Sequence, residues 1–186
     1  MKIFLQKVEY SLLALFLAVQ TQVPFVLIQF YKGRDQSFSM GYTLLILMIY
    51  LLIIFYALRM AKKEGLLTLD FSFFNLKSVI WLVLSYLITF GVSIFAAIIM
   101  VLEGQLSGTT ANQTALQNLF QSTPVVLLIV GAVFSAPILE EIIFRGLIPQ
   151  KLFPKHELIG LIVGSILFGF FHGPTNIGSF VLYAGM

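Results

Sequence analysis

Long runs of apolar residues, separated by short polar segments, dominate this chain. The runs lie near residues 10–30, 42–60, 78–102, 124–148 and 157–183. They are continuously apolar rather than alternating between apolar and polar positions, which is typical of spanning helices and not of β-barrel strands. Several approach the roughly 20 residues that a helix needs to cross a bilayer. The pattern therefore predicts an all-α fold, a polytopic membrane helix bundle with about five spanning helices.

The polar segments divide the chain without pointing to a second domain. We expect one membrane domain over residues 1–186, with N-terminal helices in 1–102, a polar loop at about 103–122 and a C-terminal core at about 124–183. The first apolar run follows only Lys2 and Lys7, so a cleaved export signal is the alternative to a first helix. That run is interrupted between Gln20 and Pro24 and then resumes, which favours a retained helix.

Composition supports the membrane assignment. Hydrophobic residues make up 59% of the chain and charged residues only 10%, whereas about 25% of the residues in a soluble domain are charged. The chain has no cysteine, which excludes disulfides, thiolate metal ligands and a cysteine nucleophile. This composition predicts the lipid bilayer, and not a nucleic acid, as a partner. The composition specifies no oligomeric state.

The Lys and Arg residues lie mostly at one side of the predicted helices. If the N-terminus is cytoplasmic, eight of them lie inside, Lys32 and Arg34 lie outside, and Arg145 falls within the membrane. The eight are Lys2, Lys7, Arg59, Lys62, Lys63, Lys77, Lys151 and Lys155. Cytoplasmic loops carry the excess of basic residues, so we expect a cytoplasmic N-terminus and an external loop at 103–122. Without organelle-targeting features, a multi-pass protein of a bacterial plasma membrane is the simplest assignment.

Three charged residues interrupt the fourth apolar run. Glu140, Glu141 and Arg145 lie within the stretch AVFSAPILEEIIFRGLIPQ. A charged side chain at bilayer depth costs roughly 2.5–3.5 kcal/mol on insertion scales, so such residues are functional candidates by default. Residues four apart share a helix face, so Glu141 and Arg145 can pair, while Glu140 points about 100° away.

This spacing separates two roles. Arg145 would keep Glu141 ionised, and Glu140 would feel desolvation more strongly, which suits a general base or acid. Pro137 removes a backbone donor and can kink the helix, opening space for water. The alternative is that Glu141 and Arg145 form a structural pair between helices and that Glu140 only bonds to a neighbour.

The fifth apolar run carries one imidazole. His172 is the only residue of the types Asp, Glu, Lys, Arg and His after Glu157, and Phe168 lies one turn before it. Small residues precede it in this run, namely Gly160, Gly164, Ser165 and Gly169. They permit a close approach to a neighbouring helix, and we expect the neighbour to carry Glu140, so that Glu140 and His172 share a water. The alternative is a packed, hydrogen-bonded histidine without a chemical role.

The charged stretch and the histidine stretch resemble two motifs of one family. Residues 140–146, EEIIFRG, fit the pattern EExxxR, and residues 168–172, FGFFH, fit the pattern FxxxH. In this order, on successive membrane helices, they are similar to the CAAX protease and bacteriocin-processing family, also called CPBP or Abi intramembrane endopeptidases. The resemblance covers about residues 124–183, and the N-terminal helices are similar only in hydropathy.

The resemblance implies an all-helical bundle with its site in a membrane cavity. It implies that Glu140 and His172 activate a hydrolytic water and that Glu141, Arg145 and Phe168 support the site. The substrate would be a membrane-associated or prenylated-CAAX-like protein or peptide. We prefer a glutamate mechanism without a cofactor, and the alternative is a metalloprotease in which Glu140, Glu141 and His172 bind zinc.

One family motif is absent. The family places an HxxxN or HxxxD motif on a later helix, where it stabilises the oxyanion, and this sequence ends at Met186 without it. We expect the chain to be truncated before a further helix or helices. Because loss of an oxyanion donor costs about 10²–10³ in rate, we expect this chain alone to be inactive or nearly so.

Two other classes of function remain open. The chain can be a non-catalytic membrane scaffold or bacteriocin-immunity factor that sequesters a partner, in which case Glu140→Gln keeps its phenotype. A proton-coupled carrier would use Glu140 and His172 as a relay. Against the carrier, no pair of Gly- or Pro-broken helices occupies corresponding halves of the chain.

Overall fold

The computed structural model describes most of the chain. The described residues are 2–32, 38–67, 75–105, 109–121 and 123–186. Arg34, which we expected on the outer side, lies outside them. All the regular structure in the described ranges is helical, which confirms the all-α prediction.

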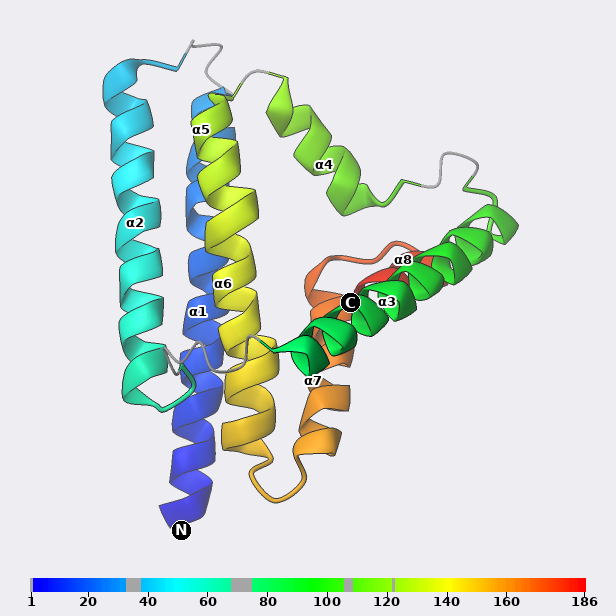
Figure 1. Cartoon of the computed structure of the whole chain (residues 1–186). Helices are drawn as coiled ribbons and strands as arrows, with labels where there is room; N and C mark the ends of the chain where they lie inside the picture. The colour runs from blue at the N-terminus through cyan, green and yellow to red at the C-terminus, as the bar shows by residue number, and fades with distance from the viewer. Residues whose placement is uncertain (1, 33–37, 68–74, 106–108, 122) are drawn as a thin grey trace. The chain divides into compact units, whose positions relative to one another are not determined.

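The helices follow the apolar runs closely up to Leu152 (Figure 1). The first elements are α1 (Lys2–Lys32), α2 (Met40–Lys63), α3 (Leu76–Leu102) and α4 (Ala111–Phe120). A continuous helix over Val125–Leu152 then combines α5 (Val125–Leu128), η1 (Ile129–Ser135), α6 (Ala136–Glu140) and η2 (Glu141–Leu152). The last elements are α7 (Glu157–Phe171) and α8 (Ile177–Ala184).

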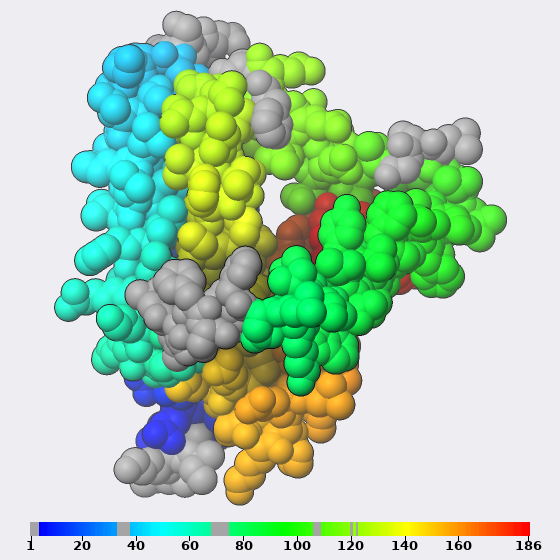
Figure 2. Space-filling model, in the orientation of Figure 1, coloured from blue at the N-terminus to red at the C-terminus, as the bar shows by residue number. Residues whose placement is uncertain are grey.

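Four helices of the described chain are long and apolar enough to span a membrane. They are α1, α2, α3 and the composite helix Val125–Leu152, and α7 is a shorter apolar helix. Many large apolar side chains face outward from them, such as Leu44, Leu51 and Phe55 of α2. Figure 2 shows the outer face of α2 in cyan, to which these side chains belong. An apolar exterior is what lipid requires, and the prediction of a polytopic membrane bundle is confirmed.

The prediction of one helix over 157–183 is wrong, because the chain turns between α7 and α8. Gly173 has a φ of 58°, in the left-handed region that favours glycine after a helix, and Pro174 cannot donate a backbone hydrogen bond. Asn176 then caps α8. Its side chain accepts from the Ser179 N–H, and the Ser179 hydroxyl accepts from the Asn176 N–H. The sequence HGPTN thus contains a stop signal followed by a start signal.

The polar loop at 103–122 also contains more structure than we expected. It includes α4, whose start is capped by the Thr110 hydroxyl, which accepts from the Gln113 N–H at 3.1 Å. The sequence of α4 is polar, so hydropathy alone does not predict a helix there. The cap residue is the signal that could have predicted it.

The composite helix is wider than a regular α-helix over most of its length. Residues Ile129–Ser135 and Glu141–Leu152 have π-helical hydrogen bonding, in which an N–H bonds to the fifth carbonyl before it. Pro137 follows the first wide segment and Pro149 lies inside the second. Proline lacks an N–H and clashes with the carbonyl four residues earlier, so a change of register accommodates it. We expected a kink at Pro137, and the structure shows wide turns before and after it.

The chain forms two compact units, which we describe separately. Unit one contains residues 1–67 and 116–164, and unit two contains residues 68–115 and 165–186. Nothing in this division tests the prediction of one membrane domain, which stays a prediction.

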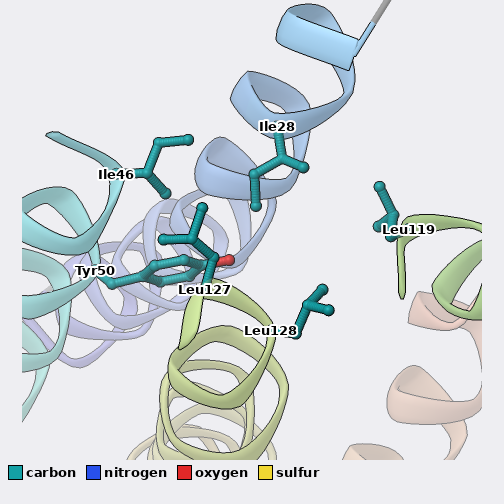
Figure 3. Packing of buried hydrophobic residues seen from close by; sticks show 6 residues of the cluster. All are labelled: Ile28, Ile46, Tyr50, Leu119, Leu127 and Leu128. Carbon is teal, nitrogen blue, oxygen red and sulfur yellow. The ribbon is translucent and has the colours of Figure 1, made fainter. Parts of the chain in front are cut away.

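In unit one, α1, α2 and the composite helix pack side by side around an apolar core. Figure 3 shows six of its buried side chains: Ile28, Ile46, Tyr50, Leu119, Leu127 and Leu128. Near the basic ends of these helices, the Tyr10 hydroxyl donates to Glu64 at 3.0 Å, and the Lys151 ammonium lies 5.8 Å from the centre of the Tyr10 ring. These contacts tie both ends of the composite helix into the bundle.

In unit two, α8 lies against α3. A Cβ atom at Gly178 would lie 2.5 Å from the Met100 side chain and 2.8 Å from the Ala96 carbonyl oxygen, so only glycine permits this approach. The Glu103 carboxylate accepts hydrogen bonds from the Ile177 and Gly178 N–H groups, at 3.1 and 3.0 Å. An anion at a helix N-terminus satisfies backbone donors that otherwise lack partners.

Candidate active site

The glutamates lie on a part of the composite helix whose buried face packs inside unit one. This packing determines which way each residue of the helix faces. Leu139, Ile143 and Leu147 recur every four residues and are at most 2% exposed, and this part of the chain packs against α1. The two carboxylates are on other sides of the helix. Glu140 is half-buried and Glu141 is exposed.

Glu141 and Arg145 form the expected ion pair. The Arg145 Nη1 atom donates to the Glu141 Oε2 atom. The bundle of unit one does not bury the pair, because 51% of the Arg145 side chain and 59% of the Glu141 side chain remain exposed. Within the described chain the pair is therefore open on one side and is not enclosed between helices.

The ion pair borders a cavity of about 500 Å³ in unit one. The walls are mostly apolar and come from the end of α2 and from the composite helix, for example Leu58, Ile138 and Ile142. The polar members of the lining are Glu141, Arg145 and Gln150. Glu140 does not line it, which agrees with the expected angle between the two glutamates. Apolar walls with a few polar groups are typical of ligand sites.

His172 is the first residue after α7, at the turn toward α8. Its Nδ1 atom lies 2.9 Å from the Phe168 carbonyl oxygen. A carbonyl oxygen only accepts, so this hydrogen bond requires the proton on Nδ1. Nε2 is then the acceptor nitrogen of the neutral ring. An imidazole in this tautomer can accept a hydrogen bond or a proton from water through Nε2.

Aromatic rings surround the imidazole. The Phe168 and Tyr183 rings both have their centres 4.3 Å from the His172 ring centre. Tyr183 stacks at an interplanar angle of 15°, and Phe171 approaches edge-on at 5.9 Å. We expected a supporting role for Phe168 and none for Tyr183, because an isolated tyrosine in an apolar run carries no local signal for its partner.

The small residues of α7 contact two different partners. A Cβ atom at Gly160 would lie 2.5 Å from the Pro149 Cα atom, and Gly164 lies against the Phe144 carbonyl. These contacts confirm that this part of α7 approaches the helix that carries Glu140. Gly169 instead packs against Phe180 of α8, where a Cβ atom would be 2.8 Å from the ring.

The predicted site residues fall into the two units. Glu140, Glu141 and Arg145 belong to unit one, and Phe168 and His172 belong to unit two. Within each unit the expected local contacts are present. The convergence of Glu140 and His172 on a shared water stays a prediction, as does zinc binding by Glu140, Glu141 and His172, because both sets draw on the two units.

Comparison with known proteins shows related sequences. The family model described as "Type II CAAX prenyl endopeptidase Rce1-like" matches residues 122–186. The chain is 29% identical over 146 residues to UPF0177 protein YvdC of Lactococcus lactis subsp. lactis (strain IL1403). That alignment covers 77% of this chain and 54% of YvdC, so the chain spans about half of that relative.

A second relative is aligned over more of its length. UPF0177 protein YajF of the same strain is 30% identical over 168 residues, which cover 89% of this chain and 82% of YajF. No solved structure matches the chain. Both motifs lie inside residues 122–186, and together with the alignment to YajF this places the chain in the CAAX protease and bacteriocin-processing family of intramembrane endopeptidases.

Proposed function

We propose that the protein is an intramembrane endopeptidase that hydrolyses a peptide bond of a membrane-associated or prenylated-CAAX-like protein or peptide. One observation carries the proposal: the EExxxR and FxxxH motifs occur in order in a polytopic helical protein, inside the residues that match the Rce1-like family model. The organism of the relatives supports a bacterial plasma membrane, with the N-terminus on the cytoplasmic side as the basic residues suggest.

Glu140 and His172 would activate the water. Glu140 removes a proton from the water as its oxygen attacks the scissile carbonyl carbon, and it returns that proton to the leaving amine. His172 accepts a hydrogen bond through Nε2, in agreement with the Nδ1 contact to the Phe168 carbonyl. The carbonyl oxygen gains negative charge in this step and needs donors that this chain does not supply through an HxxxN or HxxxD motif. We therefore propose that these 186 residues alone have little activity.

The cavity beside Glu141 and Arg145 suits an apolar part of the substrate. Its apolar walls can hold large side chains or an isoprenoid, and the ion pair lies in its lining, where it can meet the polar backbone of a peptide. In this proposal, Glu141 and Arg145 support the site and do not exchange protons with the substrate.

We propose a reaction without a metal cofactor. A zinc site made of Glu140, Glu141 and His172 is the alternative, in which the metal would lower the pKa of the water. The measurement is metal analysis of the purified full-length protein together with a chelator assay. Stoichiometric zinc whose removal abolishes hydrolysis would overturn the metal-free mechanism.

The decisive experiment is proteolysis by the full-length protein in liposomes. Glu140→Gln should lower kcat by about 10²–10⁴-fold, because the side chain keeps its shape and loses its base. Glu157→Gln is the matched control, since Glu157 is exposed at the start of α7. Full activity of Glu140→Gln would reject the endopeptidase mechanism. A scaffold or immunity factor, the second candidate, predicts an unchanged phenotype in this variant.

A further inference from the structure

Tyr183 is the most buried aromatic partner of His172. It is 8% exposed, whereas Phe168, Phe171 and His172 are half-buried. Its ring is nearly parallel to the imidazole, with 4.3 Å between the centres. A parallel ring at this distance restricts the plane in which the imidazole can lie.

The Tyr183 hydroxyl is itself held in place. It lies 2.6 Å from the Thr110 hydroxyl, and Thr110 is 2% exposed. The Asn112 side-chain amide donates to the same tyrosine oxygen at 3.4 Å. Thr110 directly precedes α4 and Asn112 lies in its first turn, in the polar segment between α3 and the composite helix. A residue far away in the sequence therefore fixes the ring that stacks on His172.

The helix that carries Tyr183 is also anchored. Glu103 caps the N-terminus of α8, and Gly178 lies in close contact with α3. Both anchors come from the same unit as His172, so the whole chain of contacts belongs to one compact body. The Tyr183 ring thus has little freedom to follow a movement of the imidazole.

We propose that Tyr183, held by Thr110, is a positioning residue for His172. This inference rests on the proposed function and identifies the side chain that orients His172. The stack fixes the plane of the imidazole, and the Phe168 carbonyl fixes the proton on Nδ1, so that Nε2 is the acceptor nitrogen. Tyr183 needs no contact with the substrate for this role. Its loss leaves a ring that rotates and populates both tautomers, of which one is productive.

The first test is the position of the imidazole proton. Nitrogen-15 NMR of the full-length protein in nanodiscs distinguishes the Nδ1–H tautomer from the Nε2–H tautomer, and the His172 signals are those that disappear in His172→Gln. We expect the Nδ1–H tautomer in the wild type and a mixture in Tyr183→Leu. Tyr86→Leu is the matched control, because Tyr86 is 71% exposed on α3 of the same unit. This readout does not require activity.

The second test measures kcat and KM separately. Tyr183→Leu should lower kcat about 10–100-fold, the range found when the groups that orient metal-bound histidines are removed, with little change in KM. Tyr183→Phe keeps the stack and loses the contact with Thr110, so its loss should be smaller. Thr110→Val loses the same contact and also the cap of α4, so its rate should fall at least as much as that of Tyr183→Phe. Thr110→Ser keeps the hydroxyl and should retain the wild-type rate.

The outcomes separate the two proposals. An unchanged tautomer and an unchanged kcat in folded Tyr183→Leu would reject the positioning role while Glu140→Gln remains inactive. Full hydrolysis by Glu140→Gln would reject the endopeptidase mechanism whatever the NMR result. If Tyr183→Leu does not fold, Tyr183→Phe and the two Thr110 variants decide, and equal rates in all three would reject the positioning role.

Discussion

The glutamates of unit one and the histidine of unit two are held by different means. Glu140 and Glu141 belong to a long helix whose register is set by several buried leucine and isoleucine side chains, so no single side chain positions them. His172 lies in a turn after a helix end, where its ring contacts the Phe168 carbonyl and the rings of Phe168 and Tyr183. Substitutions far from the histidine should therefore affect it more than equivalent substitutions affect the glutamates.

The largest expected effect is on the histidine itself. His172→Gln removes the acceptor Nε2 and should lower kcat by about 10²–10⁴-fold. The assay is hydrolysis by the full-length protein, with the thermal unfolding midpoint as the check of folding. His156→Gln is the control, because His156 is exposed in the turn before α7. A loss as large in His156→Gln would contradict the assignment.

The second effect tests the packing of α7 against the composite helix. Gly160→Val should lower the free energy of unfolding by about 1–3 kcal/mol or more, because the new side chain meets the backbone of Pro149. Chemical denaturation in detergent measures it. Gly91→Ala is the matched control, since a Cβ atom at Gly91 has no neighbour within 4 Å. Similar stability of the two variants would mean that α7 does not pack closely on η2.

The third effect concerns the anchoring of α8. Glu103→Ala removes both acceptors at its N-terminus and should cost about 0.5–2 kcal/mol, the usual cost of losing a helix cap. Hydrogen exchange at the Ile177 and Gly178 amides is the measurement, and exposed Glu9 on α1 supplies the control Glu9→Ala. Unchanged exchange at both amides would show that another group caps α8.

The smallest effect is expected for the ion pair. An ion pair that faces water contributes about 0–1 kcal/mol. Glu141→Gln and Arg145→Gln should each change the free energy of unfolding by that amount where these half-exposed side chains meet water. A double-mutant cycle measures the coupling between them. A coupling of several kcal/mol would mean that the pair is buried in the membrane-embedded protein, and the contrast with the histidine would then weaken.

Local signals in the sequence account for the helices and for the local parts of the site. Apolar runs long enough to span a bilayer predicted α1, α2, α3 and the composite helix, because lipid demands continuous apolar length and internal backbone bonding. The spacing of four between Glu141 and Arg145 predicted their pairing, because helix geometry is local. Glycine and proline at 173 and 174 are local turn signals as well, and hydropathy alone does not detect them because the residues on both sides are apolar.

Only the tertiary structure decided which distant residues meet. Thr110 and Tyr183 lie 73 positions apart, and no pattern within either segment indicates the other. The exposure of the Glu141–Arg145 pair and the wide turns around Pro137 also depend on how neighbouring segments pack. A sequence specifies chemical groups and local backbone preferences, while their orientation comes from contacts that folding creates between distant segments.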